Sequence, residues 1–317
     1  MNKQQVGHIK NNGTLLVITG LILTNIFWGA SGVAVKVAQL QLGTFEIVAL
    51  RFIAAMPLLI LATVLWKGWN ALKIDKKDLP YIAILAFLGI PLEFLLQVTS
   101  LAYTTATCFT LIFSLSPFFI IFASAVLIKE KITRHKAIGA LIGFIGVTFI
   151  ITNGSLAVPT NLLGDAIAIM ANIVWALYTV LGKSINEKYS ALTVLNYTFI
   201  FGALELLPFY FISPRLSPAA FTETTWIAMI FLTIFCSLVA FLLYNYGTEK
   251  LPASIAGMFI YVQPLSGVAL AAIVLGESIT IYTILGTFLI IYGIYEAERR
   301  GGLINGIKNV ENNRKSQ

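Results

Sequence analysis

Residues Ser116–Gly146 read SPFFIIFASAVLIKEKITRHKAIGALIGFIG, and the pattern returns 147 residues later in Gln263–Gly293, QPLSGVALAAIVLGESITIYTILGTFLIIYG. Each stretch contains an apolar helix with a proline, a short polar corner, and a second apolar helix with spaced glycines. Seven residue pairs recur in place: Pro117 with Pro264, Ala125 with Ala272, Glu130 with Glu277, Ile132 with Ile279, Thr133 with Thr280, Gly139 with Gly286, and Gly146 with Gly293. Apolar composition alone does not produce such matches, so the chain contains one unit twice.

The composition is that of a protein embedded in a lipid bilayer. Of the 317 residues, 58% are hydrophobic and 11% are charged, and the mean hydropathy is +0.88. A soluble domain carries about 25% charged residues. The net charge of +7 is therefore interpreted first as a feature of membrane topology, and no nucleic-acid partner is expected.

Ten apolar runs are long enough to cross a membrane, which takes about 20 residues per helix. The connections between them are short and contain helix breakers or caps. The polar tail, residues 298–317, is expected to be cytoplasmic and disordered. The ten runs span residues 14–35, 44–66, 79–99, 103–128, 134–152, 162–182, 191–212, 225–247, 253–275 and 279–297.

The runs divide into two units of five, residues 14–152 and 162–297. The same offset pairs further positions without a gap: Asn25 with Asn172, Trp28 with Trp175, Lys36 with Lys183, and Phe52 with Phe199. Because five is an odd number, the second unit must enter the membrane from the opposite side. The sequence therefore predicts an all-α integral membrane protein with ten transmembrane helices in two inverted five-helix repeats, which is a transporter architecture.

Basic residues indicate how the chain is oriented, since lysine and arginine gather on the cytoplasmic side. Eighteen of the 21 lie at helix ends that share the side of the two termini. Lys36 and Arg215 lie at the opposite ends, and Arg51 lies inside a helix. We expect a multi-pass protein of the cytoplasmic membrane with both termini in the cytoplasm.

Several short motifs occur in the same order in both halves. In the first half they are Trp28-Gly29, Lys36, Arg51-Phe52, Ser116-Pro117 and Glu130-Lys131-Ile132-Thr133. In the second half they are Trp175, Lys183, Pro264, Gly276-Glu277-Ser278-Ile279-Thr280 and Gly286. Through these motifs the chain resembles the ten-helix EamA-type branch of the drug/metabolite transporter superfamily over residues 15–297. Gln263, where a serine would precede the proline, and Glu93, where an apolar residue would stand, depart from that pattern.

The resemblance implies an inner-membrane carrier for small metabolites, often an exporter of amino acids or related compounds. Asn25 and Trp28 lie three residues apart and share a helix face, as do their repeat mates. Such polar faces are expected to point inward, either to line a cavity or to join helices. The expected substrate-binding residues are Asn25, Trp28, Glu93, Gln97, Ser114, Asn172, Trp175, Tyr244, Tyr261 and Gln263.

Two charged side chains are expected inside the membrane, Arg51 and Glu93. A charge at that depth is costly unless it is paired or functional. One interpretation is a buried ion pair between them. The other is that Glu93 binds either the substrate's amino group or a coupled proton. Pro117 and Pro264 are expected to kink their helices, because proline removes a backbone hydrogen bond.

Other functions are disfavoured by what the sequence lacks. It contains no HExxH, GxSxG or P-loop motif, and its two cysteines and two histidines have no metal-binding spacing. We therefore expect no enzyme, no cofactor and no metal. The leading prediction is a secondary transporter that exports a small amphipathic metabolite by alternating access. The alternatives are a multidrug or other organic-solute exporter and, less favoured, a channel, sensor or membrane enzyme. The protein is expected to be a monomer or a homodimer.

Overall fold

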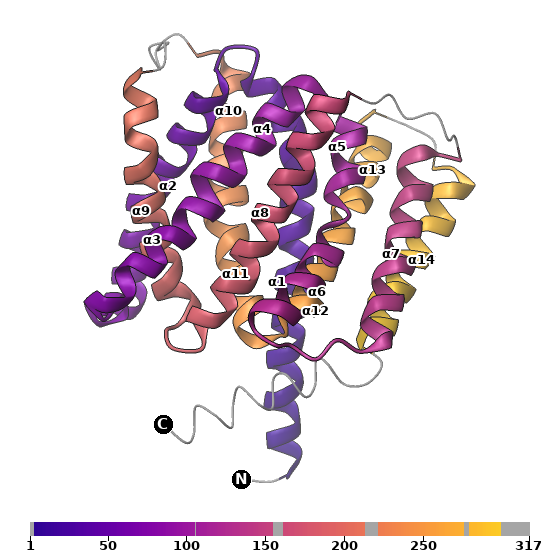
Figure 1. Ribbon diagram of the computed structural model, residues 1–317, viewed down its shortest axis with the longest axis horizontal. Coiled ribbons are helices and arrows are strands. Elements are labelled where there is room, and N and C mark those ends of the chain that lie inside the picture. Colours follow the sequence, from indigo (N-terminus) through magenta and orange to yellow (C-terminus); the bar gives the residue numbers. More distant parts are fainter. Residues whose placement is uncertain (1–2, 105, 155–160, 213–220, 276–278, 299–317) are drawn as a thin grey trace.

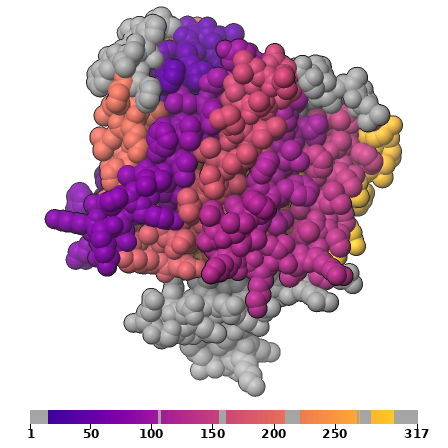
Figure 2. All heavy atoms as spheres, in the orientation of Figure 1, coloured from indigo at the N-terminus to yellow at the C-terminus, as the bar shows by residue number. Residues whose placement is uncertain are grey.

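The computed structural model describes residues 3–104, 106–154, 161–212, 221–275 and 279–298. These residues form a bundle of helices without strands (Figure 1). Eight stretches are long and apolar enough to cross a membrane, and Ile281–Ala297 adds a shorter apolar helix. The all-helical membrane architecture is thereby confirmed. The space-filling view shows helices of the N-terminal half sharing one face with the first helix of the C-terminal half (Figure 2).

Each of the ten expected helices has a helical counterpart, and four of these consist of several pieces. The first half comprises α1 (Lys3–Ala38), α2 (Thr44–Lys67), α3 (Leu79–Phe87) with η3 (Leu88–Leu92) and α4 (Glu93–Tyr103), α5 (Ala106–Phe113) with α6 (Ser116–Leu127), and α7 (Arg134–Thr152). The second comprises α8 (Leu162–Asn186), α9 (Ala191–Ile212), α10 (Glu223–Ile230) with η5 (Phe231–Val239) and α11 (Ala240–Lys250), α12 (Ala253–Met258) with η6 (Phe259–Tyr261) and α13 (Val262–Leu275), and α14 (Ile281–Glu298). The short turns η1 (Trp69–Leu72) and η2 (Lys76–Asp78) lie between α2 and α3.

The polar corners that recur in the sequence start helices in both halves. The Thr133 hydroxyl accepts a hydrogen bond from the backbone N–H of Lys136 at 3.3 Å and caps α7. The Thr280 hydroxyl accepts one from the N–H of Thr283 at 3.3 Å, at the start of α14. Such caps satisfy backbone donors that a helix leaves unpaired at its first turn. Residues Gly276 to Ser278 of the second corner lie outside the described residues, as does the tail 299–317.

The expected proline kinks are breaks rather than bends. The chain turns at Ser114 and Leu115, and Pro117 lies in the first turn of α6. In the second half, the 3₁₀ turn η6 precedes α13, and Pro264 lies in the first turn of α13. Proline is tolerated in a first helical turn because its missing N–H has no partner to lose there. The sequence could place the prolines but not show that each helix ends and restarts just ahead of its proline.

Helices α7 and α14 form a close antiparallel pair built on the recurring glycines. A Cβ placed on Gly139 would lie 2.4 Å from the backbone oxygen of Gly293, and one on Gly146 would lie 2.7 Å from that of Gly286. Glycine allows this approach, as small residues do between membrane helices. The 147-residue offset converts the Gly139–Gly293 contact into the Gly286–Gly146 contact. The two helices therefore pair through equivalent positions.

The remaining helices interleave the two halves in a matching way. Helix α1 packs against α11 and α13, and its counterpart α8 packs against α4 and α6. Helices α2 and α9, which occupy equivalent positions in the two halves, pack against each other. The π-helical stretches η3 and η5 also occur at equivalent positions, in the third helix of each half. The core therefore lies between the halves, not within either one.

Candidate functional site

A cavity of about 570 Å³ lies between the two halves. Its walls combine aromatic rings, aliphatic side chains, glycines and two charged groups. The lining residues are Trp28, Gly29, Ser31, Gly32, Val35, Arg51, Glu93, Phe94, Gln97, Leu101, Phe109, Thr110, Phe113, Ile150, Ile151, Trp175, Gln263, Pro264 and Gly267. A cavity of this size and mixed character is typical of a site for a small organic molecule.

Two repeat-related tryptophans meet in the cavity wall. The rings of Trp28 and Trp175 lie edge to face, with centroids 5.2 Å apart and planes at 89°. The Trp28 indole N–H donates to the backbone carbonyl of Cys236 at 2.9 Å, in the π-helical stretch η5. The Tyr244 ring lies 5.2 Å from that of Trp28 and 5.1 Å from that of Trp175. The two halves thus meet through aromatic contacts at this site.

Arg51 of α2 holds a positive charge against this aromatic cluster. Its side chain is buried, with 3% of the residue exposed. Its Nε donates to the Ser237 hydroxyl, and its guanidinium carbon lies 4.6 Å from the centre of the Phe94 ring. A guanidinium over an aromatic face is stabilised by the ring quadrupole. The Nη2 nitrogen is buried and has no hydrogen-bond partner in the described part of the chain.

Glu93 of α4 brings a carboxylate into the same cavity. Only 1% of the residue is exposed. Its Oε1 accepts a hydrogen bond from the Gln97 amide at 3.3 Å, and Oε2 has no partner among the described residues. Glu93 and Arg51 are near enough to attract each other electrostatically, but neither is in a salt bridge within the described chain. The Phe94 ring and Ser237 hold Arg51 instead, so each charge keeps one unpartnered atom.

Gln263 lines the cavity, but Asn25 supports it from behind. The Gln263 amide donates to Asn25 Oδ1 at 3.1 Å. Asn25 is fully buried, and its own amide donates to the backbone oxygen of Leu21 at 2.7 Å. Asn25 therefore orients Gln263 and does not itself face the cavity.

Asn172 joins helices at the break ahead of Pro117. Its amide donates to the backbone oxygen of Ile112 at 2.8 Å, and its Oδ1 accepts from the Ser116 hydroxyl. These bonds hold backbone groups that the break leaves free. Neither Asn172 nor Pro117 is among the residues lining the cavity, and Asn172 follows the alternative of interhelical joining.

Three other expected residues also lie away from the cavity wall. Ser114 donates to the Thr110 carbonyl at 2.7 Å, at the end of α5. The Tyr261 hydroxyl donates to the Ala140 carbonyl at 2.7 Å, which ties η6 to α7. The Tyr244 hydroxyl lies 3.1 Å from that of Thr179. In this conformation Tyr244 and Tyr261 join different helices, whereas the Ser114 bond is local to the end of α5.

The structure adds cavity residues that sequence reasoning missed. Phe94 contributes the ring beneath Arg51, and it immediately follows Glu93 in the sequence. Its repeat mate, Phe241, was a signal that could have found it. The apolar additions with bulky side chains carry no such signal, because one apolar residue in a membrane helix resembles another: Val35, Leu101, Phe109, Phe113, Ile150 and Ile151. The remaining additions are Ser31, Gly32, Thr110 and Gly267.

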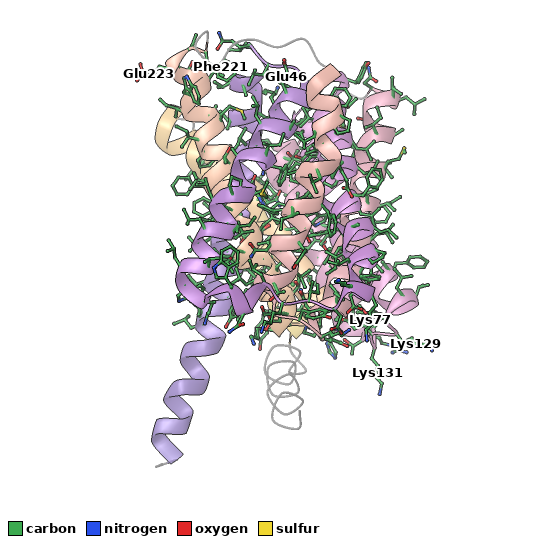
Figure 3. The ribbon with its side chains drawn as sticks, turned by 90° about the vertical axis from the view of Figure 1, so that its left-hand side faces the viewer. Glu46, Lys77, Lys129, Lys131, Phe221 and Glu223 are labelled. Atoms are coloured by element: carbon green, nitrogen blue, oxygen red, sulfur yellow. The ribbon has the colours of Figure 1, made fainter. Side chains whose placement is uncertain are left out.

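The cavity occupies one end of the bundle. Figure 3 shows Glu46 and Glu223 at one end, and Lys77, Lys129 and Lys131 at the other. We call these the acidic end and the basic end. Part of the lining comes from the last turns of α1, α4 and α7, which run from the basic end to the acidic end: Val35, Leu101, Ile150 and Ile151. The cavity therefore lies toward the acidic end.

Two layers close the bundle toward the basic end. In the first, the Asn245 amide donates to the Tyr178 hydroxyl at 3.1 Å, and both residues are buried. In the second, Lys136 is paired with Glu130 at 2.6 Å, and Glu130 also accepts from the Ser254 hydroxyl of α12. The second layer links the α6–α7 corner of one half to the other half.

No group of three or more metal-ligating side chains gathers within the described chain. The comparisons with known proteins identify the family of the chain. The EamA-like transporter family matches twice, over residues 15–152 and 162–296. The chain belongs to the EamA-like transporter family.

Relatives of known sequence extend over almost the whole length. A protein of Archaeoglobus fulgidus, named an uncharacterized transporter, is 31% identical over 87% of this chain and 94% of its own. The uncharacterized transporter YetK of Bacillus subtilis is 30% identical over 93% of this chain and 92% of its own. A solved crystal structure shares the fold with a TM-score of 0.75, at 19% identity, over 90% of this chain and 96% of that one.

The EamA-like protein is thus a transporter that spans a cell membrane several times. The family accounts for the paired halves and the small-molecule cavity between them.

Proposed function

We propose that this EamA-like transporter exports a small amphipathic metabolite, an amino acid or a related compound, across the cytoplasmic membrane by alternating access. The observation that carries the proposal is the cavity between the halves. It holds one guanidinium and one carboxylate, Arg51 and Glu93, each with an unpartnered atom. Opposite charges inside an apolar enclosure match a solute that carries both an amino group and a carboxylate.

The charges are better explained by a solute than by packing alone. Burial of charged groups costs several kcal/mol each, and a bound zwitterion would provide a partner for the one atom that each group leaves unsatisfied. Glu93 would bind the ammonium group of the solute, and Arg51 would bind its carboxylate. The rings of Phe94, Trp28 and Trp175 would contact the apolar part.

Alternating access is supported by the two ends of the bundle. The cavity lies toward the acidic end, and two layers of buried contacts close it toward the basic end. A second arrangement would open the basic end and close the acidic one. If residues 14–152 and 162–297 are inverted repeats, exchange of their conformations produces that second arrangement from the first.

Glu93 is also the proposed site of energy coupling. It would hold either a proton or the ammonium group of the solute, because one carboxylate cannot bind both. Binding of a proton to Glu93 from outside the cell would then release the solute to the outside. A broader multidrug exporter is the second candidate, favoured by the large apolar share of the lining.

The test uses purified protein in proteoliposomes, with exchange of radiolabelled amino acids measured by counterflow. Trp28→Ala and Trp175→Ala should each reduce exchange at least tenfold at unchanged protein abundance. Leu58→Ala, an exposed position on α2, is the control and should exchange as the parent does. Normal exchange by both tryptophan variants would place the solute elsewhere.

A further inference from the structure

Two glycines line the cavity without any packing reason to be glycine. Gly32 lies on α1 and Gly267 on α13, two helices that pack against each other. A Cβ placed on either would have no described atom within 4 Å. Glycine weakens a helix relative to alanine, so this cost at two positions of one cavity calls for an explanation other than helix packing.

A neighbouring glycine shows what a packing requirement looks like on the same helix. Gly29 lies one turn before Gly32, and a Cβ there would lie 2.0 Å from the Ser266 hydroxyl oxygen. Ser266 directly precedes Gly267 in the sequence. The contact at Gly29 thus joins α1 to α13, and just beyond it Gly32 and Gly267 leave open space.

The open space belongs to the cavity that holds the unpartnered charges. Arg51 Nη2 and Glu93 Oε2 lack partners within the described chain, and both residues are more than nine-tenths buried. They come from α2 and α4, whereas the glycines come from α1 and α13. One cavity therefore offers charged groups on one pair of helices and open, apolar space on another pair.

We propose that Gly32 and Gly267 form a recess for the apolar side group of the solute and set the largest side group that the transporter accepts. This inference rests on the proposed function, because it assigns the zwitterionic end of the solute to Arg51 and Glu93. The recess would exclude solutes whose side group is larger than the volume that the two glycines leave free. Methyl or isobutyl groups at these positions would fill that volume first and leave the charged contacts in place.

The first experiment measures counterflow of alanine, leucine, phenylalanine and tryptophan in proteoliposomes. Gly32→Leu and Gly267→Leu should reduce exchange of phenylalanine and tryptophan at least tenfold relative to exchange of alanine. Gly182→Ala is the control, since Gly182 of α8 also has no described atom near its Cβ position and does not line the cavity. An equal loss for all four amino acids in well-folded variants would overturn the recess.

A second experiment tests the recess without any transported solute. Gly32→Cys and Gly267→Cys are treated with methanethiosulfonates that carry a methyl or a benzyl group. Both reagents should label both positions at similar rates, whereas the wild-type protein, with Cys108 and Cys236 buried, should react slowly. Labelling by the methyl reagent alone would refute a recess of side-group size. If labelling succeeds but the wild-type protein exchanges none of the four amino acids, the recess stands and the proposed solute class fails.

Discussion

Two buried charges that share a cavity without pairing are the central observation at the scale of residues. Arg51 is held by a serine hydroxyl and a phenylalanine ring, and Glu93 by a glutamine amide. A direct salt bridge would bring their charged atoms within 4.0 Å, and none is formed among the described residues. Each group therefore keeps one buried atom without a hydrogen-bond partner in that part of the chain.

This arrangement leads to a prediction for Glu93→Gln. The variant should fold and reach the membrane at normal abundance, because no ion pair is broken. Loss of a charge-assisted hydrogen bond, worth about 1.5–3 kcal/mol, should weaken zwitterion exchange roughly tenfold to a hundredfold. Counterflow at fixed abundance measures the effect.

The matched control is Glu205→Gln on α9, which removes a carboxylate that does not line the cavity. It should leave exchange unchanged. Low abundance of Glu93→Gln, together with normal abundance of the double variant Arg51→Glu/Glu93→Arg, would favour the ion-pair interpretation. Proton-driven transport that survives Glu93→Gln would exclude the coupling role.

At the scale of elements, the α7–α14 pair and the broken fourth helices have different requirements. The pair depends on backbone contacts at the glycines and has no space for a side chain. The breaks ahead of Pro117 and Pro264 are held by side-chain bonds from Asn172 and Tyr261. The pair is thus fixed by backbone contacts, whereas the broken helices are held by individual side-chain hydrogen bonds.

The α7–α14 pair should be intolerant of even one methyl group. Gly139→Ala places a Cβ 2.4 Å from the Gly293 oxygen, and overpacking of this kind costs about 1–3 kcal/mol. Thermal unfolding in detergent should show a lower midpoint for Gly139→Ala. Gly182→Ala, with open space at the same atom, should keep or raise the midpoint. Equal midpoints for the two variants would contradict the close backbone contact.

The closing layer at the basic end should instead have to open during transport. Glu130 and Ser254 are hydrogen-bonded across the two halves. Glu130→Cys combined with Ser254→Cys, joined by a short bifunctional thiol reagent, should stop exchange, and each single variant with the same reagent should not. Full exchange by the cross-linked double variant would show that this end stays closed throughout the cycle.

At the scale of the whole molecule, the repeat predicted the membrane fold because its evidence lies in chemically distinctive residues. Pro117, Glu130 and Gly139 each recur as the same residue type 147 positions later, and a generally apolar composition would not produce these matches. The cavity was only partly predictable. Trp28, Glu93, Gln97, Trp175 and Gln263 line it, whereas Asn25, Asn172 and Tyr261 satisfy polar groups at helix contacts.

The limit has a physical origin. Inside a membrane, a polar side chain is held inward whether it meets a solute or a neighbouring helix, so sequence alone gives both roles the same pattern. Where a helix is interrupted, backbone carbonyl groups lose their helical hydrogen bonds. The Asn172 amide donates to one of these carbonyls, that of Ile112. The sequence shows the proline but not which amide will serve the break.

The last prediction concerns orientation, which decides on which side of the membrane the cavity lies. Basic residues gather at the end that holds Lys77, Lys129 and Lys131 (Figure 3), and such residues favour the cytoplasmic side. On this prediction the acidic end, toward which the cavity lies, faces outward. A membrane-impermeant thiol reagent on intact cells should label Glu223→Cys, exposed at the acidic end. It should label Lys131→Cys and Gln5→Cys only after the membrane is permeabilised. Labelling of Gln5→Cys from outside would reverse the topology, and the cavity would then be the site at which the cytoplasm delivers the solute.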